Sequence, residues 1–149
     1  MNYIKAKSST RVLAIDYGDS RIGLALSDIM HVIAKPYKTI NNSSYDSVIS
    51  NLQEIIINNS VGEILIGLPV TLKNNNSEQT NKVKAFIEKL SEKVSIPIIS
   101  YDERLTSVSA TRSLVQQGIK TGKNKGAIDM TAAAIFLQNY LDEKTIIQK

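Results

Sequence analysis

The order of apolar and polar segments predicts an α/β fold: a mixed five-stranded sheet flanked by helices. Two observations predict it. The chain opens with three strand-like segments joined by short turns, which is typical of an antiparallel meander. From residue 44 onward, helical spacing of apolar residues alternates with short apolar strands, and this alternation favours right-handed crossovers between parallel strands. We expect residues 1–149 to form a single domain with a core over about residues 11–142.

The first three strands are predicted from short apolar segments between turns. Arg11–Tyr17 is apolar apart from its charged first residue and Asp16, which indicates a buried strand, and Arg21–Ser27 follows a glycine-containing turn as its antiparallel partner. His31–Ile40 is the expected third strand. Pro36 lies within it, and proline in a strand indicates a sheet edge or a bulge.

The rest of the chain alternates between two apolar periods. In chain order we expect a helix over Ser44–Asn58, a strand over Glu63–Gly67, a helix capped by Ser77, a strand over Pro97–Asp102, a helix over Thr106–Gln117 and a helix over Ala127–Asp142. Between the last two helices, Gly122–Gly126 is expected to be a basic loop, and the tail from Glu143 is expected to be loose.

Three acidic residues are the candidate catalytic and metal-binding groups. Asp16 ends an apolar run, and a buried carboxylate is costly unless it is paired or bound to a cation. Glu103 follows a strand whose carboxyl end lies where binding sites gather in such sheets, and the strand with Asp16 is expected beside it. Asp129 is expected in the first turn of the last helix. Three carboxylates from two strand ends and a helix start suit Mg²⁺ or Mn²⁺, hard cations that prefer oxygen ligands.

Each acid also has an explanation that needs no metal. Gly18 can form a hairpin turn, although this leaves Asp16 inside the strand unexplained. Glu103 can begin a solvated loop. Asp129 can complement the helix macrodipole, as acids in a first helical turn commonly do.

Composition favours an anionic partner and excludes several kinds of site. The formal net charge is +4, which suits nucleic acid. The chain has no cysteine, which excludes disulfides and thiolate chemistry, and His31 is its one histidine. No run of about 18 apolar residues occurs, so we expect a cytoplasmic protein that does not enter the membrane.

Five basic residues are candidate contacts to a phosphate backbone. They are Arg21, Arg104, Lys120, Lys123 and Lys125. The alternative for Arg104 is neutralisation of its acidic neighbours, and the alternative for the three lysines is a solvated connecting loop.

Four segments resemble the YqgF/RuvX family, the Holliday junction resolvase-like proteins later described as pre-16S rRNA nucleases. Asp16–Asp28 carries the pattern Asp-Tyr-Gly-x-x-Arg-Ile-Gly-Leu-Ala-x-Ser-Asp of the family's opening motif. Gly67–Pro69, Asp102–Thr106 and Asp129–Ala133 follow in the family's order. The resemblance extends from about residue 11 to residue 142. It departs at Lys73–Asn76, where the family usually has glycine in the loop after Gly-Leu-Pro.

The resemblance implies a ribonuclease H-like fold and a cytoplasmic bacterial nuclease whose catalytic acids are Asp16, Glu103 and Asp129. The expected activity is metal-dependent phosphodiester hydrolysis, with the 5′ end of precursor 16S ribosomal RNA as the preferred substrate. Ribosomal precursor particles are expected partners, and the expected state is a monomer or a weak homodimer.

Three other functions stay open at this point. Within the same chemistry, the substrate can be a four-way DNA junction instead of RNA. A non-catalytic nucleic-acid-binding module is a second alternative, although carboxylates repel phosphate unless a metal intervenes. An actin-like ATPase is the third, but such enzymes pair two domains of this kind. The sequence also leaves open the cleavage position and the choice between endonuclease and exonuclease action.

Overall fold

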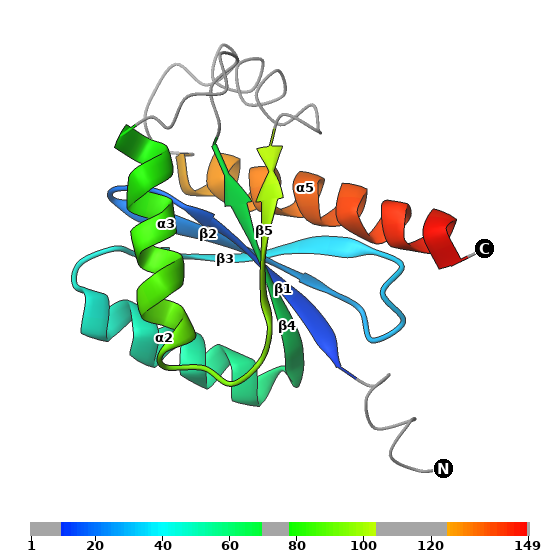
Figure 1. The fold of residues 1–149 in the computed structure, drawn as a ribbon, viewed down its shortest axis with the longest axis horizontal. Coiled ribbons are helices and arrows are strands. Elements are labelled where there is room, and N and C mark those ends of the chain that lie inside the picture. The colour runs from blue at the N-terminus through cyan, green and yellow to red at the C-terminus, as the bar shows by residue number, and fades with distance from the viewer. Residues whose placement is uncertain (1–9, 70–77, 104–124, 149) are drawn as a thin grey trace.

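The computed structural model describes residues 10–69, 78–103 and 125–148, and for residues 125–129 and 146–148 it describes the backbone only. Its centre is a five-stranded sheet in the order β3-β2-β1-β4-β5 (Figure 1). The strands are β1 (Arg11–Tyr17), β2 (Arg21–Ser27), β3 (Ala34–Asn41), β4 (Val61–Leu68) and β5 (Ile98–Asp102). The pairs β1–β2 and β2–β3 are antiparallel, whereas β1–β4 and β4–β5 are parallel. The predicted mixed five-stranded sheet is confirmed.

The third strand begins at Ala34, three residues later than the sequence predicted. The reason is local. The Asp28 carboxylate accepts hydrogen bonds from the backbone N–H groups of Val32 and Ile33 at 2.7 and 3.0 Å, and these bonds hold the preceding residues in a turn. His31 takes a left-handed backbone conformation in that turn, with φ of 58°.

The prediction for Pro36 is confirmed in both respects. β3 is an edge strand, and its pairing with β2 shifts register between Leu24 and Ala25, whose partners are Lys38 and Pro36. Proline has no N–H to donate to a ladder, so an irregular edge position accommodates it without losing a hydrogen bond.

Two helices cover one face of the sheet. They are α2 (Tyr45–Asn58) and α3 (Glu78–Ser91), seen together in Figure 1. The Ser44 side chain caps α2 by accepting a hydrogen bond from the Ser47 N–H, so the helix begins one residue after the predicted start. Their apolar stripes pack on alternate residues of the central strands, and the largest core cluster contains Leu13, Ile15, Leu52, Ile66, Val83, Phe86 and Leu90.

In the described part of the chain, one long helix, α5 (Lys125–Gln148), covers the opposite face. Its buried residues Ala132, Ala133, Phe136, Leu137 and Leu141 pack on Val12, Ala14, Ala25, Leu65 and Tyr101 of the sheet. No described helix is both long and apolar enough to cross a membrane.

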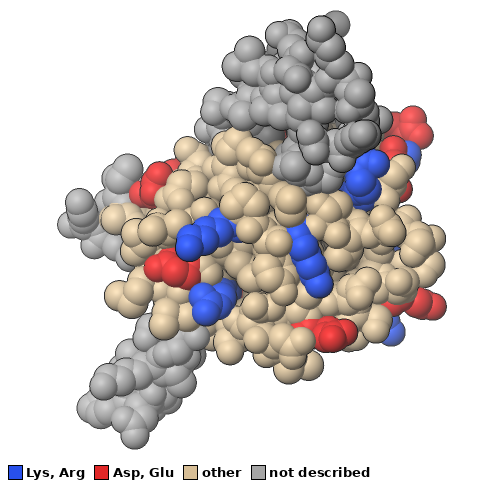
Figure 2. Space-filling view, turned by 180° about the vertical axis from the view of Figure 1, so that it is seen from behind, with Lys and Arg blue, Asp and Glu red and all other residues tan. Residues whose placement is uncertain are grey.

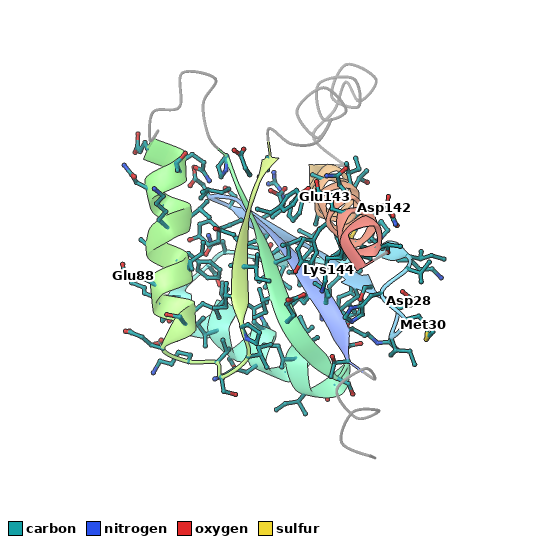
Figure 3. The ribbon with its side chains drawn as sticks, turned by 45° about the vertical axis from the view of Figure 1, so that its right-hand side comes forward. Asp28, Met30, Glu88, Asp142, Glu143 and Lys144 are labelled. Carbon is teal, nitrogen blue, oxygen red and sulfur yellow. The ribbon has the colours of Figure 1, made fainter. Side chains whose placement is uncertain are left out.

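The sequence prediction for both ends of α5 was wrong. The helix begins two residues before Ala127 and continues six residues beyond Asp142. The last turns stay helical because they bind the sheet: Lys144 lies 3.6 Å from the Glu63 carboxylate of β4, and Glu143 accepts a hydrogen bond from Tyr101 of β5. Asp142, Glu143 and Lys144 are seen near the C-terminal end of α5 in Figure 3. Ser77, the predicted helix over 106–117 and most of the predicted basic loop lie outside the described residues.

Two substitutions in α2 test which of its faces stabilises the fold. Leu52 is fully buried, whereas Ile57 is 77% exposed. We expect Leu52→Ala to lower the free energy of unfolding by about 2–5 kcal/mol, because it removes buried methyl groups and leaves a cavity. Ile57→Ala should change it by less than about 0.5 kcal/mol. Urea unfolding of both variants checks this, and equal losses would contradict the packing of α2.

Candidate active site

Asp16 lies at the carboxyl end of β1, next to the last residue of the strand. It is 7% exposed and is paired in register with Gly23 of β2. Successive side chains of a strand point to opposite faces, so Asp16 shares the α5 face with Val12 and Ala14. The carboxylate therefore lies at the rim of the apolar layer between the sheet and α5.

Glu103 directly follows β5 and is also 7% exposed. Its carboxylate packs over the backbone of Gly67 in β4. A Cβ on Gly67 would lie 2.8 Å from Glu103 Oε2 and 2.7 Å from Cε2 of the Phe136 ring. The absence of a side chain at this position is therefore what lets the Glu103 carboxylate and the α5 aromatic ring approach the sheet together.

The strand register places Asp16 and Glu103 on either side of Gly67. Ile15 pairs with Ile66, and Gly67 pairs with Tyr101, two residues before Glu103. The sequence interpretation had placed β1 beside the strand that carries Glu103, and this was wrong because β4 lies between them. Both acids still belong to the carboxyl edge of the three parallel strands.

Asp129 lies in the second turn of α5, because the helix begins at Lys125, earlier than predicted. The first turn contains no acidic residue. The explanation of Asp129 as a first-turn partner of the macrodipole therefore loses its basis. Position 129 precedes Ala132 and Ala133 by three and four residues, and such positions share one face of a helix. The Asp129 side chain is outside the described part of the structure.

The chemistry of the described donors fits a hard divalent cation. Asp16 and Glu103 offer only carboxylate oxygens, the ligands that Mg²⁺ and Mn²⁺ prefer. Among the side chains that the structure describes, no group of three or more histidines or acids is arranged to hold a metal ion. A three-carboxylate site thus depends on Asp129.

The predicted phosphate contacts are described only in part. Arg21 opens β2 at the edge that carries Asp16, where it pairs in register with Asn41 of β3. Lys125 opens α5, and Arg104, Lys120 and Lys123 lie outside the described residues. On the α5 face, the charged side chains that are described are scattered singly over a mostly uncharged surface (Figure 2).

A hydrogen-bonded cluster that the sequence analysis missed joins β5 to α5. Tyr101 donates to Glu143 Oε1 at 2.9 Å. Asn139 donates to the same Oε1 at 3.0 Å and also to the Tyr101 hydroxyl. Tyr101 further packs against the ring of Phe136, with centroids 6.4 Å apart. Two features of the sequence could have indicated this cluster. Tyr101 lies two residues before Glu103, so the two positions share one face of an extended chain. Asn139 and Glu143 are four residues apart, so they are neighbours on a helix.

A second contact fixes α5 to β4. The Tyr140 hydroxyl donates to Glu63 Oε1 at 3.2 Å, and its ring meets the Tyr101 ring edge-on, with centroids 5.9 Å apart. Burial, followed by the Glu63 charge, raises the pKa of Tyr140. Together the two tyrosines fix the position of α5 relative to β4 and β5, and Glu103 directly follows β5.

Comparisons with known proteins agree on one family. The sequence model of the family RuvX, described as Holliday junction resolvase, matches residues 10–143. A protein of Ruminiclostridium cellulolyticum is 43% identical over 133 residues, which cover 89% of this chain and 94% of that protein. One from Desulforamulus reducens is 41% identical over 132 residues, covering 89% and 96%. Both carry the name "Putative pre-16S rRNA nuclease".

A solved structure supports the fold independently of sequence. The RuvC protein of T. thermophilus, in complex with a Holliday junction substrate, superposes with a TM-score of 0.60 at 13% identity. The match covers 91% of this chain and 96% of that one. The predicted ribonuclease H-like fold is confirmed by this likeness and by the sheet order.

Because of Tyr101, the free energy of unfolding is expected to depend on pH in the alkaline range. Burial raises the pKa of Tyr101 to about 12; the hydrogen bond from Asn139 lowers this pKa, and the hydrogen bond to Glu143 raises it. An unfolded tyrosine releases its proton near pH 10, so between about pH 10 and 12 the unfolded chain binds fewer protons and stability falls as pH rises.

We expect Tyr101→Phe to remove up to about 1.4 kcal/mol of that loss for each pH unit in this window. Urea unfolding at a series of pH values measures it, with Tyr37→Phe, a partly exposed tyrosine on β3, as the control. An unchanged slope in Tyr101→Phe would show that this hydroxyl titrates normally.

Proposed function

The chain belongs to the RuvX family, and from this membership we propose that it is a nuclease that hydrolyses phosphodiester bonds with Asp16, Glu103 and Asp129 as its catalytic acids. The observation that carries the assignment is the pair of buried carboxylates on either side of Gly67. Acids placed together at the carboxyl edge of parallel strands are costly for a fold and useful for binding a cation.

Mg²⁺ or Mn²⁺ is the proposed cofactor, held by Asp16, Glu103 and Asp129. When bound, such ions supply an activated water and stabilise the charge that develops on the phosphate. The protein contributes the ligands and their placement. Asp16 and Glu103 are anchored by strands, and α5 carries Asp129 toward the same edge. No histidine or cysteine is needed, in keeping with a chain that has one histidine and no cysteine.

RNA is the proposed substrate, and the precursor of 16S ribosomal RNA is the specific candidate. Support comes from the names of relatives that are 41–43% identical over most of their length. Cleavage of a four-way DNA junction is the second candidate, because the family model carries that description. Ribosomal precursor particles in the cytoplasm are the proposed setting.

Substitution of the central acid tests the catalytic assignment. We expect Asp16→Asn to reduce Mg²⁺-dependent RNA cleavage by about 100-fold or more, since a lost metal ligand costs several kcal/mol of transition-state stabilisation. Its thermal stability should be unchanged or higher, because one of several neighbouring negative charges is removed. Asp142→Asn, an exposed acid on α5, should cleave normally.

The same assay separates the two substrates. Precursor rRNA, linear DNA and four-way junctions are incubated side by side with Mg²⁺, Mn²⁺ or EDTA. Preferential cutting of the junction would replace the RNA proposal. Full activity of Asp16→Asn, or cleavage that persists in EDTA, would end the metal-dependent assignment.

Gly67→Ala tests whether the space above β4 serves the site. The added Cβ would press on Glu103 Oε2 and on Phe136, so we expect cleavage to fall about tenfold or more, beyond any loss explained by unfolding. Gly62→Ala is the matched control in the same strand. Its Cβ would meet the side chain of Thr10 instead, so it should lower stability without lowering the activity of the folded protein. Equal activity losses in both variants would contradict a role for Gly67 in placing Glu103.

A further inference from the structure

A groove lies at the end of β1, on the face of the sheet opposite to the Asp16 side chain. It has a volume of about 250 Å³ and is walled by Tyr17, Tyr45 and Phe86, with Lys82 and Lys89 at its rim. Most of its lining residues belong to α2 and α3. These two helices lie on the face of the sheet opposite α5 (Figure 1). We propose that this groove binds an unpaired nucleotide of the substrate strand, beside the cleavage point. The inference rests on the proposed nuclease function and extends it.

The walls of the groove are suited to a flat ring. Tyr17 and Phe86 stack with centroids 4.4 Å apart and planes inclined by 28°. Phe86 is buried and Tyr17 is partly exposed, so the pair forms a fixed apolar surface. Proteins that bind single strands stack bases on aromatic side chains, because every base has a π-face. The volume is below the usual range for drug-sized ligands and suits a single base.

The opposite wall is held by its own contacts. The Tyr45 hydroxyl donates to the backbone carbonyl of Lys89 at 2.7 Å, and Lys89 Nζ lies 5.2 Å from the centre of the Tyr45 ring. These contacts join the first residue of α2 to α3 across the groove. The ring is therefore positioned before a ligand arrives, which reduces the entropy lost on binding.

The charge at the rim suits a phosphate. Lys82 and Lys89 line the groove, and no acid is among the described residues that line it. Lys82 does pair with Asp19 at 3.2 Å and lies 3.9 Å from Glu78. These are surface pairs whose acids are 61% and 88% exposed, and exposed pairs contribute little, so a phosphate can displace them at small cost.

The end of β1 links the groove to the acidic site. Asp16 and Tyr17 are consecutive residues whose side chains point to opposite faces of the sheet. The turn that follows Tyr17 is held in place, since Asn42 donates to the Gly18 carbonyl at 2.9 Å and Gln79 donates to the Tyr17 carbonyl at 3.3 Å. A strand that crosses this edge of the sheet can present a phosphate to Asp16 and a neighbouring base to Tyr17.

The test compares Tyr45→Ala with a matched control on RNA substrates of different length. Tyr37→Ala is the control, because Tyr37 is also a partly exposed tyrosine with a lysine over its ring (Lys38 Nζ at 5.5 Å) but is not part of this groove. The substrates carry unpaired nucleotides on both sides of the cleavage point, or are trimmed on one side or the other.

We expect Tyr45→Ala to raise KM for the full substrate by about 5- to 100-fold, the range of one lost base stack, with kcat nearly unchanged. On the substrate trimmed at the side that fills the groove, wild type and Tyr45→Ala should have equal KM. Tyr45→Phe keeps the ring but loses the hydroxyl bond that positions it, so its KM should lie between those of wild type and Tyr45→Ala, which separates stacking from damage to the fold. Lys89→Gln should flatten the salt dependence of binding by about one unit of slope.

A KM effect of Tyr45→Ala that is the same on all three substrates, or no effect at all, would overturn the nucleotide subsite while leaving the nuclease intact. If wild type cleaves no RNA, the proposed function fails, and the subsite is then judged by fluorescence anisotropy with labelled single-stranded RNA. Equal affinities of wild type and Tyr45→Ala in that measurement would reject it independently of catalysis.

Discussion

The close approach of three elements over the bare backbone of Gly67 is the constraint on which the site depends. β4 lies between β1, which carries Asp16, and β5, which leads to Glu103, and a side chain at position 67 would press on the Glu103 carboxylate and on Phe136 of α5. Without one, Phe136 and the Glu103 carboxylate share the space above the sheet. Protein interiors are densely packed, so the crowding at Gly67 restricts movement of both Phe136 and the Glu103 carboxylate.

The position of α5 follows from that constraint and from polar contacts further along the helix. Phe136 fixes one point of the helix over β4. Tyr101 and Tyr140 fix its C-terminal half by bonding to Glu143 and Glu63, respectively. A helix held at several points along its length transmits that placement to its first turns, where Asp129 lies. Residues far from position 129 thereby help to place the part of the α5 backbone that carries it.

At the carboxyl end of β1, consecutive side chains point to opposite faces of the sheet, and the two faces differ in chemistry. Asp16 points into the layer beneath α5, where its carboxylate belongs to the proposed acidic site, and Tyr17 points into the aromatic groove between α2 and α3. A nucleic-acid strand bound across this edge would therefore meet charge-binding groups on one side and stacking groups on the other.

The sequence by itself determined the alternation of elements, the bounds of β1 and β2, and the irregular edge at Pro36. It also identified Asp16 and Glu103 as acids at strand ends. Local periodicity and turn chemistry encode all of these features. Tertiary structure alone decided the rest. The placement of β4 between the two acid-bearing strands is a choice of topology that no local pattern records. The late start of β3 came from the Asp28 side chain, and the six extra residues of α5 came from contacts with β4 and β5. In the sequence, Gly67 cannot be distinguished from other glycines. It matters because Glu103 and Phe136, from distant parts of the chain, both pack against it.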